Sequence, residues 1–297
     1  MESQKVIVYA TGPEHFEGLH MSILSLMRCA TFTCLMSVSI NVFVDVKHST
    51  QLRHFLPTKI LQNVFIYQLD TSALGNFSFH ASREKVGMLD ASENFIRFFL
   101  PMYFPQLPQV LYLDADTIVR RSVCDLFYNY SSPLEGAGLA AAPRRSSCMV
   151  QRVPSEYRAQ WVQQPTLTFN AGVFLADLKF WKRYRISEKA LSLLRRNEKE
   201  NLWLTASNPP LCIVFANAFV KLNWRWHVYG LGFKSKISNR TLNEAYILHW
   251  NGIRKPWLPT GMWKMYWRAD WAILVELSTD ICCTSILCEC QLCISWC

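Results

Sequence analysis

Short apolar runs rich in β-branched residues recur along the first part of the chain, and polar or loop-forming residues bound each of them. The runs lie at 6–10, 42–44 and 64–67, and Thr11-Gly12-Pro13 closes the first. Apolar runs of this length between turn-forming residues are typical of buried strands. We therefore expect three strands in this part of the chain.

Helical periodicity fills the intervals between these strands. Apolar residues recur every three or four positions over 17–27, which predicts a helix with one buried face, and 50–55 fits a second helix. The uncharged stretch 29–44 contains polar residues and falls short of the ~20 mainly apolar residues of a membrane span. It predicts the end of a helix followed by a buried strand. Strands that alternate with helices form parallel units, so the pattern predicts a doubly wound sheet.

The middle of the chain holds a further apolar run, at 109–113, which ends in Asp114-Ala115-Asp116. Runs of this kind are typical of strands that are covered on both faces of a parallel sheet. Before it, 93–100 predicts a helix that ends against a proline. After it, 168–175 is another apolar strand, and Asp177 stands where an N-cap would start the next helix.

Neither a repeat nor a linker rich in Pro, Gly or Ser divides the chain, so we expect one domain over residues 5–270. Six of the 11 cysteines lie beyond it, in a Cys-rich tail over 271–297 that we expect to be poorly ordered. These cysteines lack the paired spacing of a structural zinc site, which makes a zinc knuckle the less favoured interpretation.

Composition limits the class of protein, and net charge limits the class of binding partner. With 51% hydrophobic and 13% aromatic residues among 297, the chain differs from disordered sequences, and its 11 glycines exclude a collagen-like one. Lys and Arg number 31 against 22 Asp and Glu, which gives a formal net charge of +9. This excess favours an anionic partner, which could be nucleic acid, a membrane surface or a phosphorylated substrate.

Two carboxylates follow the strand predicted at 109–113. Asp114 and Asp116 stand where an open α/β sheet binds its ligands, beyond the carboxyl end of a strand. Side chains two positions apart in an extended chain point to the same side, so both can face one ligand. Hard oxygen donors suit Mg²⁺ or Mn²⁺, which would bridge them to a phosphate. Taken alone, such a pair is more often two solvated loop acids than a metal site.

A second group of polar residues lies near the end of the predicted domain. His249 follows an apolar run, Gly252 allows a close approach of the backbone to a phosphate, and Lys255 carries a positive charge. A lone histidine after a strand is more often a core residue. Beside the glycine, the lysine and an acidic pair elsewhere in the chain, it is better explained as a third metal ligand next to a diphosphate clamp.

Four motifs, in this order, carry a resemblance to a known family: Tyr112-Leu113-Asp114-Ala115-Asp116, Phe169-Asn170-Ala171-Gly172-Val173-Phe174, Pro209-Pro210-Leu211-Cys212-Ile213-Val214-Phe215 and His249-Trp250-Asn251-Gly252 with Lys255-Pro256-Trp257. The chain resembles glycosyltransferase family 8, and within it the animal glycosyltransferase 8 domain-containing proteins. The resemblance implies a single α/β domain of the GT-A (Rossmann-like) fold with a mixed, mainly parallel central sheet flanked by helices. It also implies a metal-dependent, retaining hexosyltransferase that moves a sugar from a UDP-sugar to a carbohydrate or glycoconjugate acceptor.

The resemblance assigns roles residue by residue. It implies that Asp114, Asp116 and His249 hold Mn²⁺ (or Mg²⁺) on the diphosphate of the UDP-sugar. The other positions that match donor-binding residues are Gly252 and Lys255 at the diphosphate, Arg97 before the metal strand, Ala115 inside the acidic motif, Asn170 and Ala171 at the sugar, and Ala10 and Thr11 at the uridine. It implies no partner among nucleic acids.

The chain departs from the family pattern at two places. Many members carry an acidic residue that touches the uracil after the first strand, where this chain has Gly12, so base recognition is weaker or differently built. The region 207–211 lacks the D-Q-D motif of bacterial members, so the residue at the anomeric carbon stays unassigned. These departures keep one alternative open, an inactive UDP-sugar-binding protein of the same fold. The excess of positive charge keeps open another, a basic nucleic-acid-binding protein, for which no recognisable module is present.

The expected cellular compartment is inferred mainly from the resemblance, which implies the Golgi lumen. Three Asn-x-Ser/Thr triplets, at Asn76, Asn129 and Asn239, could accept glycans there. Residues 1–5 are polar, and the apolar run after them is shorter than the roughly 7–15 residues of a signal sequence. We therefore expect membrane association only through an anchor that lies upstream of this chain.

Overall fold

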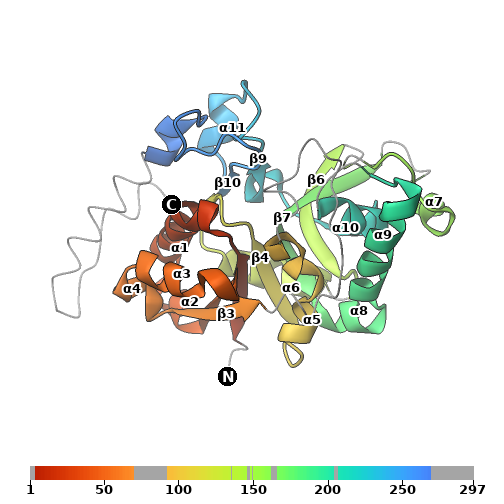
Figure 1. The fold of residues 1–297 in the computed structure, drawn as a ribbon, viewed down its shortest axis with the longest axis horizontal. Coiled ribbons are helices and arrows are strands. Elements are labelled where there is room, and N and C mark those ends of the chain that lie inside the picture. The colour runs from red at the N-terminus through yellow and green to blue at the C-terminus, as the bar shows by residue number, and fades with distance from the viewer. Residues whose placement is uncertain are drawn as a thin grey trace.

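Seven strands form the central sheet, in the order β3-β2-β1-β4-β7-β6-β8 (Figure 1). Their bounds are β1 Lys5–Ala10, β2 Val38–Asp45, β3 Val64–Leu69, β4 Gln109–Leu113, β6 Leu139–Arg145, β7 Leu167–Asp177 and β8 Val220–Lys221. The computed structural model describes residues 4–69, 92–134, 136–145, 148, 150–161, 166–203 and 207–268.

The sheet is mixed and mainly parallel, as expected. Strands β1 to β4 run parallel to one another, and β8 is parallel to β6. Strand β7 is antiparallel to both of its neighbours, β4 and β6. An apolar run carries no information on strand direction, so the doubly wound pattern predicted from the sequence holds for the first half of the sheet and is broken at β7.

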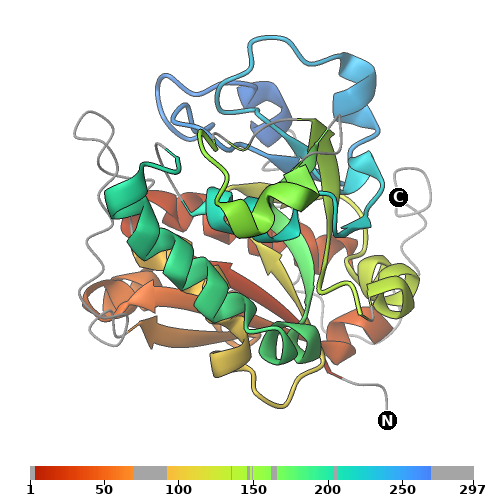
Figure 2. The same ribbon diagram turned by 90° about the vertical axis from the view of Figure 1, so that its right-hand side faces the viewer.

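Helices cover both faces of the sheet (Figure 2). On one face lie α1 Phe16–Cys29, α3 Ser49–Phe55, α4 Thr58–Leu61 and α6 Cys124–Leu134, and on the other lie α5 Leu100–Tyr103, α8 Leu178–Arg183, α9 Ile186–Glu200 and α10 Asn208–Phe215. Two hydrophobic cores result, because alternate strand residues point to opposite faces. Ile7 and Tyr9 pack in the first core, while Val6 and Val8 pack in the second.

Two local predictions differ from the structure. The stretch 29–44 contains a further short helix, α2 Phe32–Ser37, whose N-cap Thr31 accepts a hydrogen bond from the backbone N–H of Cys34. The helix predicted at 93–100 is a 3-10 turn over Ser92–Phe98, followed by α5. Pro101 lies in the first turn of that helix and does not end one, because an N–H in the first turn would have no partner within the helix.

A second, three-stranded sheet lies beside the carboxyl end of the central one (Figure 1). It consists of β5 Thr117–Val119, β10 Ile247–His249 and β9 Val228–Tyr229, in that order, with α11 Asn239–Asn243 between β9 and β10 in the chain. Strand β10 is antiparallel to β5 and parallel to β9. This small sheet brings the late part of the chain against the segment that follows β4.

Two disulfides join elements that are distant in the sequence. Cys34 of α2 pairs with Cys124 of α6, and Cys148 pairs with Cys212 of α10, at separations of 90 and 64 residues. Cross-links over loops of this length stabilise the fold mainly by restricting the unfolded chain. The Cys-rich tail and the Asn76 triplet lie outside the described residues. Within the described part, no helix is both long and apolar enough to cross a bilayer.

Candidate metal and donor site

The acidic turn after β4 is fixed by backbone contacts. The N–H of Asp114 donates to the carbonyl of Gly172 at 2.7 Å, and the Thr117 hydroxyl donates to the carbonyl of Asp114 at 2.9 Å. Strand β5 then begins at Thr117. The turn therefore holds Asp114 and Asp116 at the carboxyl edge of the central sheet, where ligands of open α/β sheets bind.

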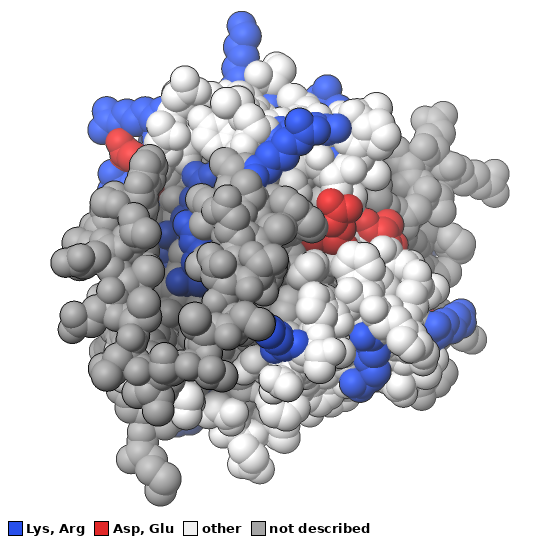
Figure 3. Space-filling view, turned by 90° about the vertical axis from the view of Figure 1, so that its left-hand side faces the viewer, with Lys and Arg blue, Asp and Glu red and all other residues white. Residues whose placement is uncertain are grey.

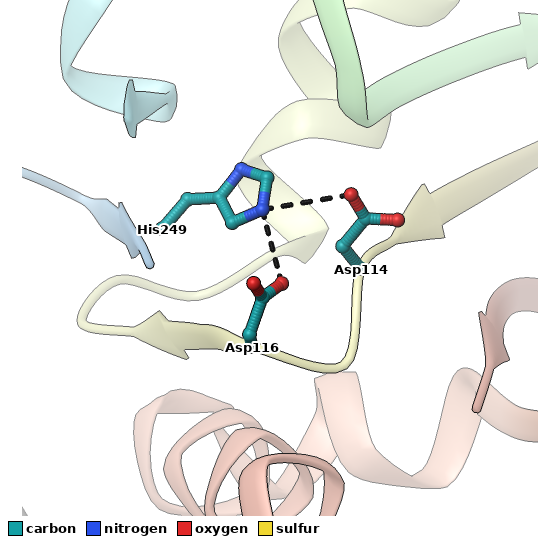
Figure 4. Close-up of side chains that lie close together, drawn as sticks. All are labelled: Asp114, Asp116 and His249. Carbon is teal, nitrogen blue, oxygen red and sulfur yellow. Dashed lines mark ion pairs between the residues drawn. The ribbon is translucent and has the colours of Figure 1, made fainter. Parts of the chain in front are cut away.

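His249 ends β10 and reaches the same place from the far end of the domain. Its Cα pairs with that of Thr117 across β5 and β10. Its Nε2 lies 3.0 Å from Oδ1 of Asp116 and 3.5 Å from Oδ2 of Asp114 (Figure 4). The structure thus brings together the three side chains that the sequence nominates as metal ligands.

The three residues fit a divalent cation on three grounds. Their ligand atoms lie within 4.8 Å of one another, and two carboxylates with an imidazole form a donor set suited to Mn²⁺ or Mg²⁺. Within the described residues, the buried Nε2 of His249 makes no hydrogen bond of good geometry. A Cβ on Gly172 would lie 2.3 Å from Cε1 of His249 and 2.4 Å from Oδ2 of Asp114, so only glycine leaves room for both ligands.

Charge at Asp116 is balanced by Lys255. The Nζ of Lys255 donates to the Asp116 carboxylate and, at 3.1 Å, to the carbonyl of Trp250. Burial alone would raise the pKa of Asp116, but the charges of Lys255 and His249 outweigh it and lower that pKa well below its ordinary value. Asp116 is therefore ionised at neutral pH, the state in which a carboxylate binds a metal.

Asp114 is oriented by Arg97. The Nη2 of Arg97 donates to Oδ1 of Asp114 at 3.0 Å, and Nη1 donates to the carbonyl of Ala171 at 2.7 Å. The guanidinium also lies over the ring of Tyr112, 4.7 Å from its centroid. Arg97 is only 4% exposed, and its hydrogen bond places it behind the Asp114 carboxylate of this candidate metal site.

The model of the family "Glycosyl transferase family 8" matches residues 6–261 of the chain. The chain belongs to glycosyltransferase family 8. The match spans the acidic turn and His249, and the resemblance drawn from four sequence motifs is confirmed.

Named relatives lie in animals and plants. "Glycosyltransferase 8 domain-containing protein 2" of Bos taurus is 30% identical over 214 residues, which cover 62% of this chain and 60% of the relative. "Probable galacturonosyltransferase 13" of Arabidopsis thaliana is 28% identical over 196 residues, covering 63% of this chain and 36% of the relative. The chain thus spans 60% or less of the length of these family 8 proteins.

Solved structures confirm the GT-A fold expected of family 8. The galactosyltransferase LgtC, in complex with donor and acceptor sugar analogues, superposes with a TM-score of 0.64 at 18% identity, over 95% of this chain and 97% of that one. Mouse xyloside xylosyltransferase 1 superposes with a TM-score of 0.55 at 14% identity, over 84% of this chain and 98% of that one.

The segment that family 8 resemblance places at the donor sugar lies on β7. The Asn170 side chain accepts a hydrogen bond from the N–H of Gly172 at 2.8 Å, and the N–H of Ala171 donates to the side chain of Asn208 at 2.6 Å. Sequence reasoning missed Asn208, although it lies in the region 207–211 where the D-Q-D motif is lacking. Asn208 and Asn170 together fix the backbone beside the candidate metal ligands.

The remaining expected donor residues lie around the same edge. Gly252 has φ +111°, and a Cβ there would lie 2.9 Å from the carbonyl oxygen of Gly232, so the turn after His249 requires glycine. At the end of β1, the N–H of Thr11 donates to the carbonyl of Phe43. Ala10 is half-buried, while Thr11 and Ala115 are buried.

One further residue touches the site. The Nε2 of His227 lies 2.8 Å from Nδ1 of His249, and the two rings are stacked. Burial, together with the charge that His249 can carry, lowers the pKa of His227 well below its ordinary value. No sequence pattern indicated this contact, since His227 lies in no motif and reaches His249 only through the pairing of β9 with β10.

Proposed function

We propose that this family 8 chain is a metal-dependent, retaining glycosyltransferase that moves a hexosyl sugar from a UDP-sugar to a carbohydrate or glycoconjugate acceptor. The observation that carries the proposal is the convergence of Asp114, Asp116 and His249 at the edge of a GT-A sheet. Residues 5–270 form the catalytic domain in this proposal, and 271–297 form a separate tail. The chain's excess of positive charge suits the anionic donor.

The chemistry follows from the residues at the site. Asp114, Asp116 and His249 would hold Mn²⁺ or Mg²⁺, and the ion would supply positive charge that stabilises the negative charge developing on the departing UDP. Lys255, beside Asp116, adds a second positive charge for the diphosphate. Arg97 keeps Asp114 directed at the ion. The new bond keeps the anomeric configuration of the donor, as the family resemblance implies.

The donor lies along the carboxyl edge of the sheet in this proposal. Asn170 and Ala171 line the sugar, Gly252 lets the backbone approach the diphosphate, and Ala10 and Thr11 line the uridine. Electrostatic interactions that strengthen as charge develops are typically the largest contribution to such catalysis.

A carboxylate is present near Gly12 even though position 12 has no side chain. A Cβ on Gly12 would lie 2.8 Å from Oε2 of Glu14, so the Glu14 side chain folds back over this glycine. Glu14 is the middle residue of the short 3-10 helix Pro13–His15 that follows β1. We propose that Glu14 supplies the acidic group for the uracil that many family members carry at the position of Gly12.

Two observations support a secretory compartment such as the Golgi lumen. Disulfides between separate elements form and persist in oxidising compartments, and the described residues contain two of them. Asn239 begins α11 and is exposed, which suits a glycan, and Asn129 is exposed on α6. The proposal predicts that Asn239→Gln removes a glycosidase-sensitive species when the chain passes through the secretory route, and an unchanged mobility would contradict it.

The nucleic-acid alternative finds little support on the face shown in Figure 3. Among the residues that the view colours, Lys and Arg side chains lie at several places around this face, and Asp and Glu side chains lie on it too, both on the right and at the upper left. Nucleic-acid-binding proteins instead cluster their positive side chains on one face or along one element. The inactive-binder alternative differs from the proposal only in turnover, which an activity assay decides.

The assay measures UDP release from a panel of UDP-sugars, with Mn²⁺ or with EDTA. The wild type is compared with Asp114→Ala and with Asp125→Ala, which removes an aspartate that pairs with Arg121 on the surface of α6. We expect Mn²⁺-dependent release that falls by about 10²–10³ in Asp114→Ala and stays unchanged in Asp125→Ala. A chain that is stabilised by a UDP-sugar but releases no UDP with any of them would be the inactive binder.

A further inference from the structure

His227 and His249 form a buried pair at two neighbouring strands of the small sheet. His227 precedes β9 and His249 ends β10, and these two strands run parallel. The rings are nearly parallel, with 17° between their planes and 5.1 Å between centroids. Nε2 of His227 lies 2.8 Å from Nδ1 of His249, the ring nitrogen that faces away from the carboxylates.

A buried imidazole at position 227 lowers the stability of the fold relative to an apolar ring. The side chain is only 3% exposed, and within the described residues its Nδ1 has no hydrogen-bond partner. A buried polar atom without a partner costs free energy, and a phenylalanine would fill a similar space without that cost. The contact from Nε2 to His249 is therefore the feature that distinguishes histidine from an apolar residue here.

A metal on Nε2 of His249 demands a particular tautomer. That nitrogen must present its lone pair, so the ring proton of the neutral imidazole moves to Nδ1 and needs an acceptor. The backbone fixes the Cα of His249 through β5 and β9 but leaves rotation about the side-chain bonds free. Nε2 of His227 lies at hydrogen-bond distance from Nδ1 and supplies the acceptor.

We propose that His227 is a positioning residue for the metal ligand His249: it accepts the Nδ1–H of His249 and so turns Nε2 toward Asp114 and Asp116. This inference rests on the proposed metal site. An imidazole can also donate from Nε2, so His227 keeps the contact when no ion is bound and the proton of His249 lies on Nε2. One side chain thus holds the ring in both states.

Two variants separate the hydrogen bond from the packing. His227→Phe keeps a flat ring of similar volume but removes the acceptor, whereas His227→Gln carries an amide oxygen at about the reach of Nε2. Each full-length variant is titrated with Mn²⁺ while the electron paramagnetic resonance signal of the free ion is recorded. We expect His227→Phe to weaken Mn²⁺ binding about 10–100-fold, and His227→Gln to stay close to the wild type. His20→Phe, a histidine on α1 outside the site, is the matched control and should leave binding unchanged.

Two results would overturn the proposal. One is a His227→Phe variant that binds Mn²⁺ as tightly as the wild type, and the other is a His227→Gln variant that loses as much affinity as His227→Phe. If the wild type binds Mn²⁺ no more tightly than Asp114→Ala does, the proposed metal site itself is refuted.

A measurement on the wild type covers the case in which His227→Phe does not fold. The ring ¹⁵N chemical shifts of the histidines report which nitrogen carries the proton, and diamagnetic Mg²⁺ leaves them observable. With Mg²⁺ bound, we expect the proton of His249 on Nδ1 and a bare Nε2 on His227. A proton found on Nε2 of His227 in the Mg²⁺-bound state would contradict the assignment.

Discussion

Lys255 donates a hydrogen bond to the carboxylate of Asp116, although 139 positions separate them in the sequence. Both side chains are buried, so each neutralises a charge that would be costly alone. The same carboxylate is a ligand of the proposed metal ion. The ammonium group and the ion therefore act on one carboxylate, and the loss of one makes the other more important.

Replacing Lys255 with methionine tests this relationship. Removing one partner of a buried ion pair typically costs about 3–5 kcal/mol, so Lys255→Met should lower the melting temperature in EDTA. Mn²⁺ should restore much of this loss, because the ion supplies positive charge to Asp116, and its stabilising effect should exceed that in the wild type. Thermal unfolding with EDTA and with Mn²⁺ measures both. Equal stabilisation by Mn²⁺ in the two proteins would contradict the account.

Adding one methyl group at Gly172 tests the geometry of the ligands. A Cβ there would overlap both His249 and Asp114, so Gly172→Ala should push the two ligands apart. We expect Mn²⁺ affinity to fall by at least tenfold, in line with the loss of one supporting contact at a metal site. Calorimetric titration with Mn²⁺ measures it. Unchanged affinity in a folded Gly172→Ala variant would show that the ligands do not converge on one ion.

Removing the charge of Glu14 tests base recognition. Hydrogen bonds to charged groups contribute about 1.5–3 kcal/mol, so Glu14→Gln should weaken UDP binding by roughly 10–100-fold. Glu17→Gln, on the first turn of α1, is the matched control and should leave UDP affinity unchanged. Calorimetric titration of UDP in the presence of Mn²⁺ compares them. If both variants bind UDP like the wild type, the base is recognised by other residues.

Much of the fold was predictable because the burial of a strand or helix determines the local pattern of apolar and polar residues. The apolar runs at 6–10, 42–44 and 109–113 became β1, β2 and β4, since a strand covered on both faces must be apolar along its length. The run at 64–67 became β3, an edge strand that is partly exposed. The reversed direction of β7 was not predictable, because direction depends on which neighbours a strand pairs with. Pro101 misled the helix prediction, since proline is tolerated at the start of a helix as readily as after its end.

The site was predictable where the residue types themselves carry the chemistry. Asp114, Asp116 and His249 stood out because metal ligands are drawn from few residue types at the ends of strands. The supporting contacts were not predictable, because they arise between distant segments. The contact of His227 with His249 can be recognised only once β9 and β10 are paired. The contact of Lys255 with Asp116 can be recognised only once the loop after β10 is placed against the acidic turn.

The central claim is that one divalent ion joins Asp114, Asp116 and His249 to the diphosphate of a nucleotide sugar. Anomalous X-ray diffraction from crystals grown with Mn²⁺ and UDP tests it most directly, because manganese scatters anomalously and carbon, nitrogen and oxygen do so only weakly. We predict one strong anomalous peak within bonding distance of both carboxylates and of Nε2 of His249, with the UDP diphosphate on its open side. UDP bound at this edge without such a peak, or a peak away from these three side chains, would contradict the account.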